Sequence, residues 1–154
     1  MTEGKKNQKQ SGFKDKTVPV TFGMKNIKEN ITITTNTPTK PSEEEIINHA
    51  ISLHSEGKTS EAAKYYQYCI NKGFNNHIVF SNYALILRDI GKLEEAALLT
   101  KKAINIKPDF FEAYSNLGTI SKDIGNLEEA ELFTRKAIDL RPNCEKAYYN
   151  LGNI

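Results

Sequence analysis

The sequence is short of the apolar segments that direct proteins into or across membranes. The N-terminal stretch "MTEGKKNQKQSGFKDK" contains no run of the ~7 to 15 apolar residues that form the core of a signal peptide. No later stretch approaches the ~20 apolar residues of a membrane-spanning helix. Cysteine is scarce as well, and Cys69 and Cys144 form no close pair of the kind used for zinc binding or redox chemistry. We therefore expect a reduced, cytoplasmic chain that makes no contact with a membrane.

The residue patterns of enzymes and metal sites are absent too. The sequence shows no nucleophile beside a base and no pair of carboxylates placed for acid–base work. His49 and His54 are five residues apart, which is off the i, i+4 spacing that puts two imidazoles on one helix face. Ordinary packing therefore explains these histidines better than a metal site does. We predict no enzymatic activity, no cofactor and no bound metal.

The N-terminal segment 1–41 differs in composition from the rest of the chain. It holds 8 Lys, no Arg and 3 acidic residues, whereas segment 42–154 holds 13 basic and 16 acidic residues. Its apolar content is too low to offset the entropy lost on ordering, so the composition predicts a disordered basic tail over 1–41. The stretch "ITITT" alternates as a strand would, but the sequence offers no partner strand. Lysines without arginine or stacking aromatics predict at most a weak, salt-sensitive attraction, so we do not expect nucleic acid to be a partner.

Order is expected to begin at "KPSEEEII". Pro41 disfavours helix immediately before it, Ser42 can cap the first amides, and Glu45 completes a capping box. From position 42 to position 154 the chain repeats itself with a constant interval, as the spacing of Asn48 and Asn82 shows (82 − 48 = 34). Three residue types mark this period, namely Asn (Asn48, Asn82, Asn116, Asn150), Gly (Gly57, Gly91, Gly125) and Ala (Ala62, Ala96, Ala130). A fixed period of this length indicates one repeated supersecondary unit.

The middle unit indicates that the repeated element is a pair of helices. In "FSNYALIL", the i, i+3, i+4, i+7 pattern of an amphipathic helix is carried by Phe80, Tyr83, Ala84 and Leu87. After Gly91, "LEEAALLTKKAI" predicts a second helix, whose apolar face comprises Leu93, Ala96, Leu99, Thr100, Ala103 and Ile104. Two antiparallel helices therefore alternate along the chain, and stacked pairs of this kind build an all-α solenoid.

The third unit, "AYSNLGTISKDIGNLEEAELFTRKAIDLRP", resembles the tetratricopeptide repeat. The matching positions are Tyr114, Leu117, Gly118, Gly125, Ala130, Ala137 and Pro142. The resemblance covers units at about 43–76, 77–110 and 111–144 with a partial unit at 145–154, and it implies a right-handed α-solenoid. The first unit departs most from the family pattern, as suits a terminal unit, at Ile46, His49, Cys69 and Phe74. Thr100 and Thr134 also replace an aromatic residue that is usual in the second helix.

The second helix of the first unit carries three tyrosines, Tyr65, Tyr66 and Tyr68. We interpret them as inter-helix packing with one solvent-exposed ring, rather than as a platform for stacking bases. Cys69 stands where the repeat requires a small buried residue, so it is expected to act as a small hydrophobic side chain.

In tetratricopeptide arrays the first helix of each unit lines a concave surface, so the resemblance implies a peptide-binding groove. The side chains expected there are Asn48, Ser81, Asn82, Leu85, Arg88, Asp89, Ser115, Asn116, Thr119, Lys122, Asp123 and Asn150. An Asn amide both donates and accepts hydrogen bonds, so a regular row of Asn can pair with the peptide groups of an extended chain whatever its side chains. This row resembles the asparagine ladder of superhelical arrays that precede glycosyltransferase domains. The alternative is that Asn is common at this point of the repeat and only hydrates the groove.

A second use of the family fold is a clamp for the C-terminal carboxylates of heat-shock chaperones. The clamp requires a basic residue and an Asn in the first unit, where this chain has Ile47 and Ile51. It also requires two basic residues in the third unit, where Asn116 and Ile120 stand, and only Asn82 fits its pattern. We therefore predict that this chain has no dicarboxylate clamp.

Together these features predict a non-enzymatic protein–protein interaction scaffold that binds an extended peptide segment of a protein partner. The alternative is the substrate-recruiting N-terminal part of a larger enzyme of the glycosyltransferase, sulfotransferase or oxygenase type. The C-terminal stretch "AYYNLGNI" repeats "AYSNLGTI", and its Tyr148, Leu151 and Gly152 occupy the stripe that elsewhere packs against a second helix. We expect either that the native chain continues into further repeats or that copies associate end to end through this helix.

Overall fold

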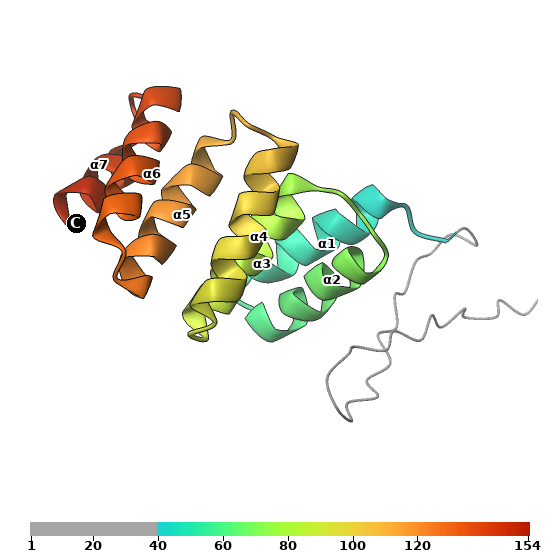
Figure 1. Cartoon of the computed structure of the whole chain (residues 1–154). Coiled ribbons are helices and arrows are strands. Elements are labelled where there is room, and N and C mark those ends of the chain that lie inside the picture. The colour runs from blue at the N-terminus through green and yellow to red at the C-terminus, as the bar shows by residue number, and fades with distance from the viewer. Residues whose placement is uncertain (1–39) are drawn as a thin grey trace, which may run out of the picture. The chain divides into compact units, whose positions relative to one another are not determined.

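The computed structural model describes residues 40–154, and in this range the chain forms seven helices and no strand (Figure 1). The helices are α1 (Glu43–Ser55), α2 (Thr59–Asn71), α3 (His77–Asp89), α4 (Leu93–Ile106), α5 (Phe111–Ile124), α6 (Leu127–Leu140) and α7 (Glu145–Gly152). In space, each helix packs beside the helix that follows it in the sequence, from α1 to α7 (Figure 1). The expected all-α solenoid is confirmed. The predicted basic tail, with its "ITITT" stretch, lies outside the described residues.

The start of α1 has the expected capping box. The Ser42 Oγ atom accepts a hydrogen bond of 3.2 Å from the backbone amide of Glu45. In return the Ser42 amide donates to Glu45 Oε2 over 2.7 Å. Two amide groups that have no partner within the helix are satisfied in this way, so the capping box stabilises the first turn of α1.

The repeated glycines end the first helix of each unit. Gly57, Gly91 and Gly125 have φ angles of 76°, 78° and 94°, in the left-handed region that is strained for residues with a Cβ atom. Each lies in the short turn that leads into the second helix. Each turn between paired helices therefore requires a residue that adopts a positive φ angle, and this requirement explains why glycine recurs at a constant interval.

The hydrophobic core continues from one unit to the next. Where paired helices approach closely, the second helices carry fully buried alanines, namely Ala62, Ala96 and Ala130. One buried cluster joins α3, α4 and α5 through Ala84, Leu87, Ala96 and Ile120. A second cluster joins the same three helices through Phe80, Ala103 and Ala113. Because each unit buries apolar surface against its neighbour, the stack gains stability that no single unit has alone.

The tyrosines of α2 correct one prediction. Tyr65, Tyr66 and Tyr68 are all buried, so the expected solvent-exposed ring is not present. The three rings pack in the core of the first unit together with Ile46, Ile47 and Leu53 of α1, which are also buried. Cys69 beside them is fully buried, as expected, and burial raises the pKa of its thiol to about 11.

No helix between residues 40 and 154 is both long enough and apolar enough to cross a lipid bilayer.

Candidate functional site

The twelve residues predicted to line the groove lie on the first helices of the units, which are α1, α3, α5 and α7. In the structure α3 packs against α5, and α5 packs against α7. We refer to the surface formed by these four helices as the first-helix face. Asn48 lies on α1, Asn150 lies on α7, and the other ten residues are divided between α3 and α5.

Three members of the Asn row connect neighbouring units. The Asn82 Nδ2 atom donates to the Tyr66 hydroxyl over 3.1 Å, which ties α3 to α2. The Asn116 Nδ2 atom donates to Ser81 Oγ over 3.2 Å, which ties α5 to α3. The Nδ2 atom of Asn150 donates to Ser115 Oγ over 3.3 Å and to Thr119 Oγ1 over 3.1 Å, which ties α7 to α5. The constant interval between these Asn residues therefore places one amide at each junction between units.

These contacts change what the Asn row can offer to a ligand. Ser81 and Ser115 are buried, and Asn116 is only 5% exposed. The prediction that these three side chains project into an open groove is corrected, because the serine hydroxyls accept the amides of the following unit. Asn82 and Asn150 remain half-buried, and Asn48 is exposed. Whether these residues bind a peptide stays a prediction.

Two basic residues of the predicted groove, Arg88 and Lys122, are not equivalent. Arg88 on α3 lies 3.1 Å from the Asp89 carboxylate and 3.6 Å from that of Asp123 on α5, so its charge is balanced within the chain. Lys122 is the counterpart of Arg88 in the next unit, but no carboxylate in the described range 40–154 forms an ion pair with it. Lys122 therefore provides a positive charge that the described part of the chain does not neutralise.

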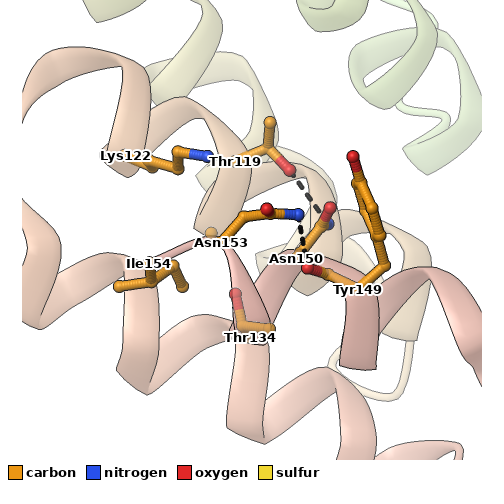
Figure 2. A pocket seen from close by; sticks show the side chains of 8 residues that line it. Thr119, Lys122, Thr134, Tyr149, Asn150, Asn153 and Ile154 are labelled. Atoms are coloured by element: carbon orange, nitrogen blue, oxygen red, sulfur yellow. Dashed lines mark hydrogen bonds between the residues drawn. The ribbon is translucent and has the colours of Figure 1, made fainter.

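A pocket of about 260 Å³ opens on this face between α5 and the C-terminal segment (Figure 2). Helix α5 contributes Gly118, Thr119 and Lys122, and α6 contributes Thr134. The remaining lining comes from four residues within 149–154. Figure 2 shows the hydroxyl of Thr134 directed toward the space among Asn150, Asn153 and Ile154. The pocket thus brings together polar groups from three helices that are separate in the sequence.

Sequence reasoning identified part of this pocket. Thr119, Lys122 and Asn150 were predicted on the first-helix face, and the structure brings them together here. The lining residues that it missed are Gly118, Thr134, Tyr149, Asn153 and Ile154. A signal for Thr134 was present, because a threonine replaces a usual aromatic residue and leaves space at that position.

The histidines of α1 pack against aromatic rings. His49 makes an edge contact with Tyr65, with ring centroids 4.8 Å apart, and His54 makes one with Tyr66 at 5.9 Å. Among the described residues, no group of three or more His, Cys, Asp or Glu side chains is close enough to hold a metal ion.

Comparison with known proteins agrees with the repeat period and the paired helices. Residues 84–125 match a family model described as TPR repeat, and residues 111–144 match one described as Tetratricopeptide repeat. No curated protein sequence matches the chain.

Several solved tetratricopeptide domains have a similar fold. The Arabidopsis OM64 TPR domain is 20% identical with a TM-score of 0.67, over 72% of this chain and 92% of that one. The second TPR domain of human RPAP3, solved with the HSP70 peptide SGPTIEEVD, is 26% identical with a TM-score of 0.64, over 73% and 91%. The first TPR of Spaghetti (RPAP3), bound to the HSP90 peptide SRMEEVD, is 22% identical with a TM-score of 0.67, over 72% and 88%. The constant repeat period, the paired helices and these matches show that residues 84–144 contain tetratricopeptide repeats.

Proposed function

We propose that this protein is a non-enzymatic interaction scaffold that binds an extended peptide segment of a protein partner on its first-helix face. The observation that carries the proposal is the pocket on that face, which opens beside polar and charged side chains that are only partly buried. The peptide complexes of the two RPAP3 domains support it, because those domains share this fold.

The side chains available to a peptide are fewer than the sequence suggested. Leu85 and Thr119 are half-buried, and Asp89 is exposed. The amide nitrogens of Asn82 and Asn150 already donate within the chain, so these residues would present their Oδ1 atoms to the N–H groups of a peptide. Binding would therefore combine a few main-chain hydrogen bonds with contacts to individual side chains.

The partner segment would differ from the peptides of the RPAP3 domains. Both of those peptides end in the acidic sequence EEVD. In this chain the clamp positions at Ile47 and Ile120 are apolar and buried, so they offer no charge to a terminal carboxylate. We therefore propose that the chain binds an internal segment of its partner rather than a chain terminus.

A pair of leucines tests the proposal. Leu85 is half-buried on the first-helix face, whereas Leu98 is exposed on α4, a second helix. Peptides would be selected by the full chain from a random displayed library, resynthesised, and measured by fluorescence anisotropy. We expect Leu85→Ser to weaken binding about ten-fold, since roughly 1.5 kcal/mol of apolar burial is lost. Leu98→Ser should leave the affinity unchanged.

Thermal unfolding of both variants controls for stability. Failure to select any peptide would contradict the proposal. So would a loss of affinity in Leu98→Ser with none in Leu85→Ser.

A further inference from the structure

We propose that Tyr66 of α2 is a positioning residue for the peptide site on the first-helix face. Its hydroxyl group holds the Asn82 amide so that the Asn82 Oδ1 atom accepts a hydrogen bond from a main-chain N–H group of the bound segment. This inference rests on the proposed function, because that N–H group belongs to the proposed peptide. It is carried by the contacts of Tyr66, by the free acceptor on Asn82 and by a paired difference between the repeat units.

The Tyr66 hydroxyl is held on two sides. The side chain is fully buried, and on the α3 side its oxygen accepts the hydrogen bond from Asn82 Nδ2 over 3.1 Å. On the α1 side the oxygen lies 3.5 Å from His54 Nδ1, and the two rings are in edge contact with centroids 5.9 Å apart. Burial raises the pKa of Tyr66, so the group remains a neutral hydroxyl near pH 7. The position of this oxygen is therefore fixed from both α1 and α3.

Asn82 keeps one acceptor for a ligand. Its Nδ2 atom is used by Tyr66, whereas its Oδ1 atom has no hydrogen-bond partner between residues 40 and 154. Asn82 is half-buried. In the same range the one unpaired side-chain atom cut off from solvent is Thr134 Oγ1, so Asn82 Oδ1 is accessible. A main-chain N–H group is the donor that every residue except proline provides, and an amide oxygen held in one orientation suits it.

Two differences from the second unit occur together in the first unit. Ile47 stands where the second unit has Ser81, so α1 offers no hydroxyl to the amide of the next unit. Tyr66 stands where the second unit has Thr100, whose shorter side chain bonds within its own helix. A tyrosine extends farther from the backbone and reaches the Asn82 amide from α2. The hydroxyl that α1 lacks is therefore supplied by α2.

The two arrangements leave the Asn side chains at different depths. Asn116 is held by Ser81 of the neighbouring first helix and is only 5% exposed. Asn82 is held by Tyr66 of a second helix and is half-buried. Both units that form this junction lie within the described residues. The junction of the first two units thus combines an amide that is fixed in orientation with an oxygen that a peptide can reach.

A conservative variant tests the role of the hydroxyl in the full chain. Tyr66→Phe removes one oxygen and keeps the ring. For a peptide selected from the displayed library, we expect it to weaken binding about five-fold by fluorescence anisotropy, the effect of one hydrogen bond. Tyr65→Phe is the matched control, because Tyr65 is also buried on α2 but its hydroxyl forms no hydrogen bond within the described part of the chain. This control should leave the affinity unchanged.

A double-mutant cycle separates positioning from a general loss of structure. If Tyr66 acts through Asn82, Tyr66→Phe should have no further effect on affinity in an Asn82→Ala background. Replacing the peptide N–H groups one at a time by ester oxygens identifies the donor. One ester should weaken binding to the unmodified chain about five-fold and have little effect with either single variant. The ester series with Asn82→Ala gives the same reading if Tyr66→Phe does not fold.

An NMR measurement needs no peptide. The side-chain amide signals of Asn82 should move in Tyr66→Phe and stay in place in Tyr65→Phe, because only the first variant removes the partner of Nδ2.

Three outcomes would overturn the proposal. Unchanged affinity in Tyr66→Phe, while Leu85→Ser still weakens binding, would remove the positioning role and leave the proposed function intact. Equal losses from Tyr66→Phe with and without the Asn82 side chain would show that Tyr66 does not act through Asn82. Asn82 amide signals that do not move in Tyr66→Phe would show that the hydroxyl does not hold the amide, whether or not a peptide is found.

Discussion

Asn116 links two repeat units through a side chain that the surrounding residues bury. Its amide donates to Ser81 of the preceding unit over 3.2 Å, at 5% exposure. We predict that Asn116→Ala lowers the free energy of unfolding by about 1 kcal/mol, because the buried Ser81 hydroxyl loses its partner. Urea unfolding followed by circular dichroism measures this. Asn48→Ala, at the exposed end of the same Asn row, is the control and should change stability by less than about 0.5 kcal/mol. Equal losses in the two variants would contradict the structural role of Asn116.

The two cysteines differ in accessibility. Burial raises the pKa of Cys69 to about 11, above its usual value of 9.0, whereas Cys144 is only half-buried. We predict that a thiol reagent at pH 8 modifies Cys144 quickly and Cys69 only after unfolding, since the Cys69 thiolate is about a hundred-fold rarer than in an exposed thiol. Single Cys→Ser variants assign the two rates. Rapid modification of Cys69 in the folded chain would show that α2 is not packed as described.

The raised pKa of Cys69 also has a pH dependence of defined sign. Because the folded state disfavours the thiolate, this burial contributes stability below the unfolded pKa, near 9, and that contribution is lost as the pH rises toward 11. Cys69→Ala should therefore flatten the fall in stability over this range of pH.

At the scale of the helix, the turn glycines set where α5 ends and α6 begins. Gly125 has a φ angle of 94°, and a Cβ atom added to it would meet no other atom within 4 Å. We predict that Gly125→Ala costs about 1 kcal/mol through backbone strain alone, and that Gly125→Asn costs less because Asn tolerates this conformation. Thermal unfolding provides the measurement. Gly152→Ala in α7 is the control, because Gly152 does not have a positive φ and also has open space around it. A larger loss in Gly152→Ala would contradict the argument.

At the scale of the whole molecule, the outer side of α7 is the surface most suited to association. Tyr148 is 52% exposed, whereas its counterpart Tyr114 on α5 is half-buried. We predict that light scattering shows the apparent mass rising with concentration, and that Tyr148→Lys reduces the rise, since a charge opposes burial of this face. A mass that stays monomeric at every concentration would contradict self-association through α7.

The basic N-terminal segment gives a second prediction at this scale. Its composition provides little apolar surface to join a core, so deletion of residues 1–40 should leave the thermal midpoint nearly unchanged. The capping box at Ser42 lies after the deletion and would still begin α1. A large drop in the midpoint would show that this segment stabilises the repeats.

Much of the fold could be predicted from local patterns. The constant repeat period, the capping box at Ser42 and the apolar stripe of α3 are all visible in the order of residues along the chain. The candidate site could be predicted only in part. Its positions on α3 and α5 followed from the period, but burial of Ser81 and Asn116 required knowledge of which helix lies beside which.

The sequence by itself therefore determined the helices, their pairing and their repeated order, because each of these follows from periodicity along the chain and from glycines that the turns require. Only the tertiary structure decided which polar groups remain free. Thr100 and Thr134 are identical in sequence position within their units, yet one hydroxyl is paired and the other is not. That difference depends on Ala84 or Gly118 across the helix pair and on where Ile120 or Ile154 lies at the next junction. Contacts of this kind join residues far apart in the chain, and their outcome is set by the volume of single side chains in a closely packed interior.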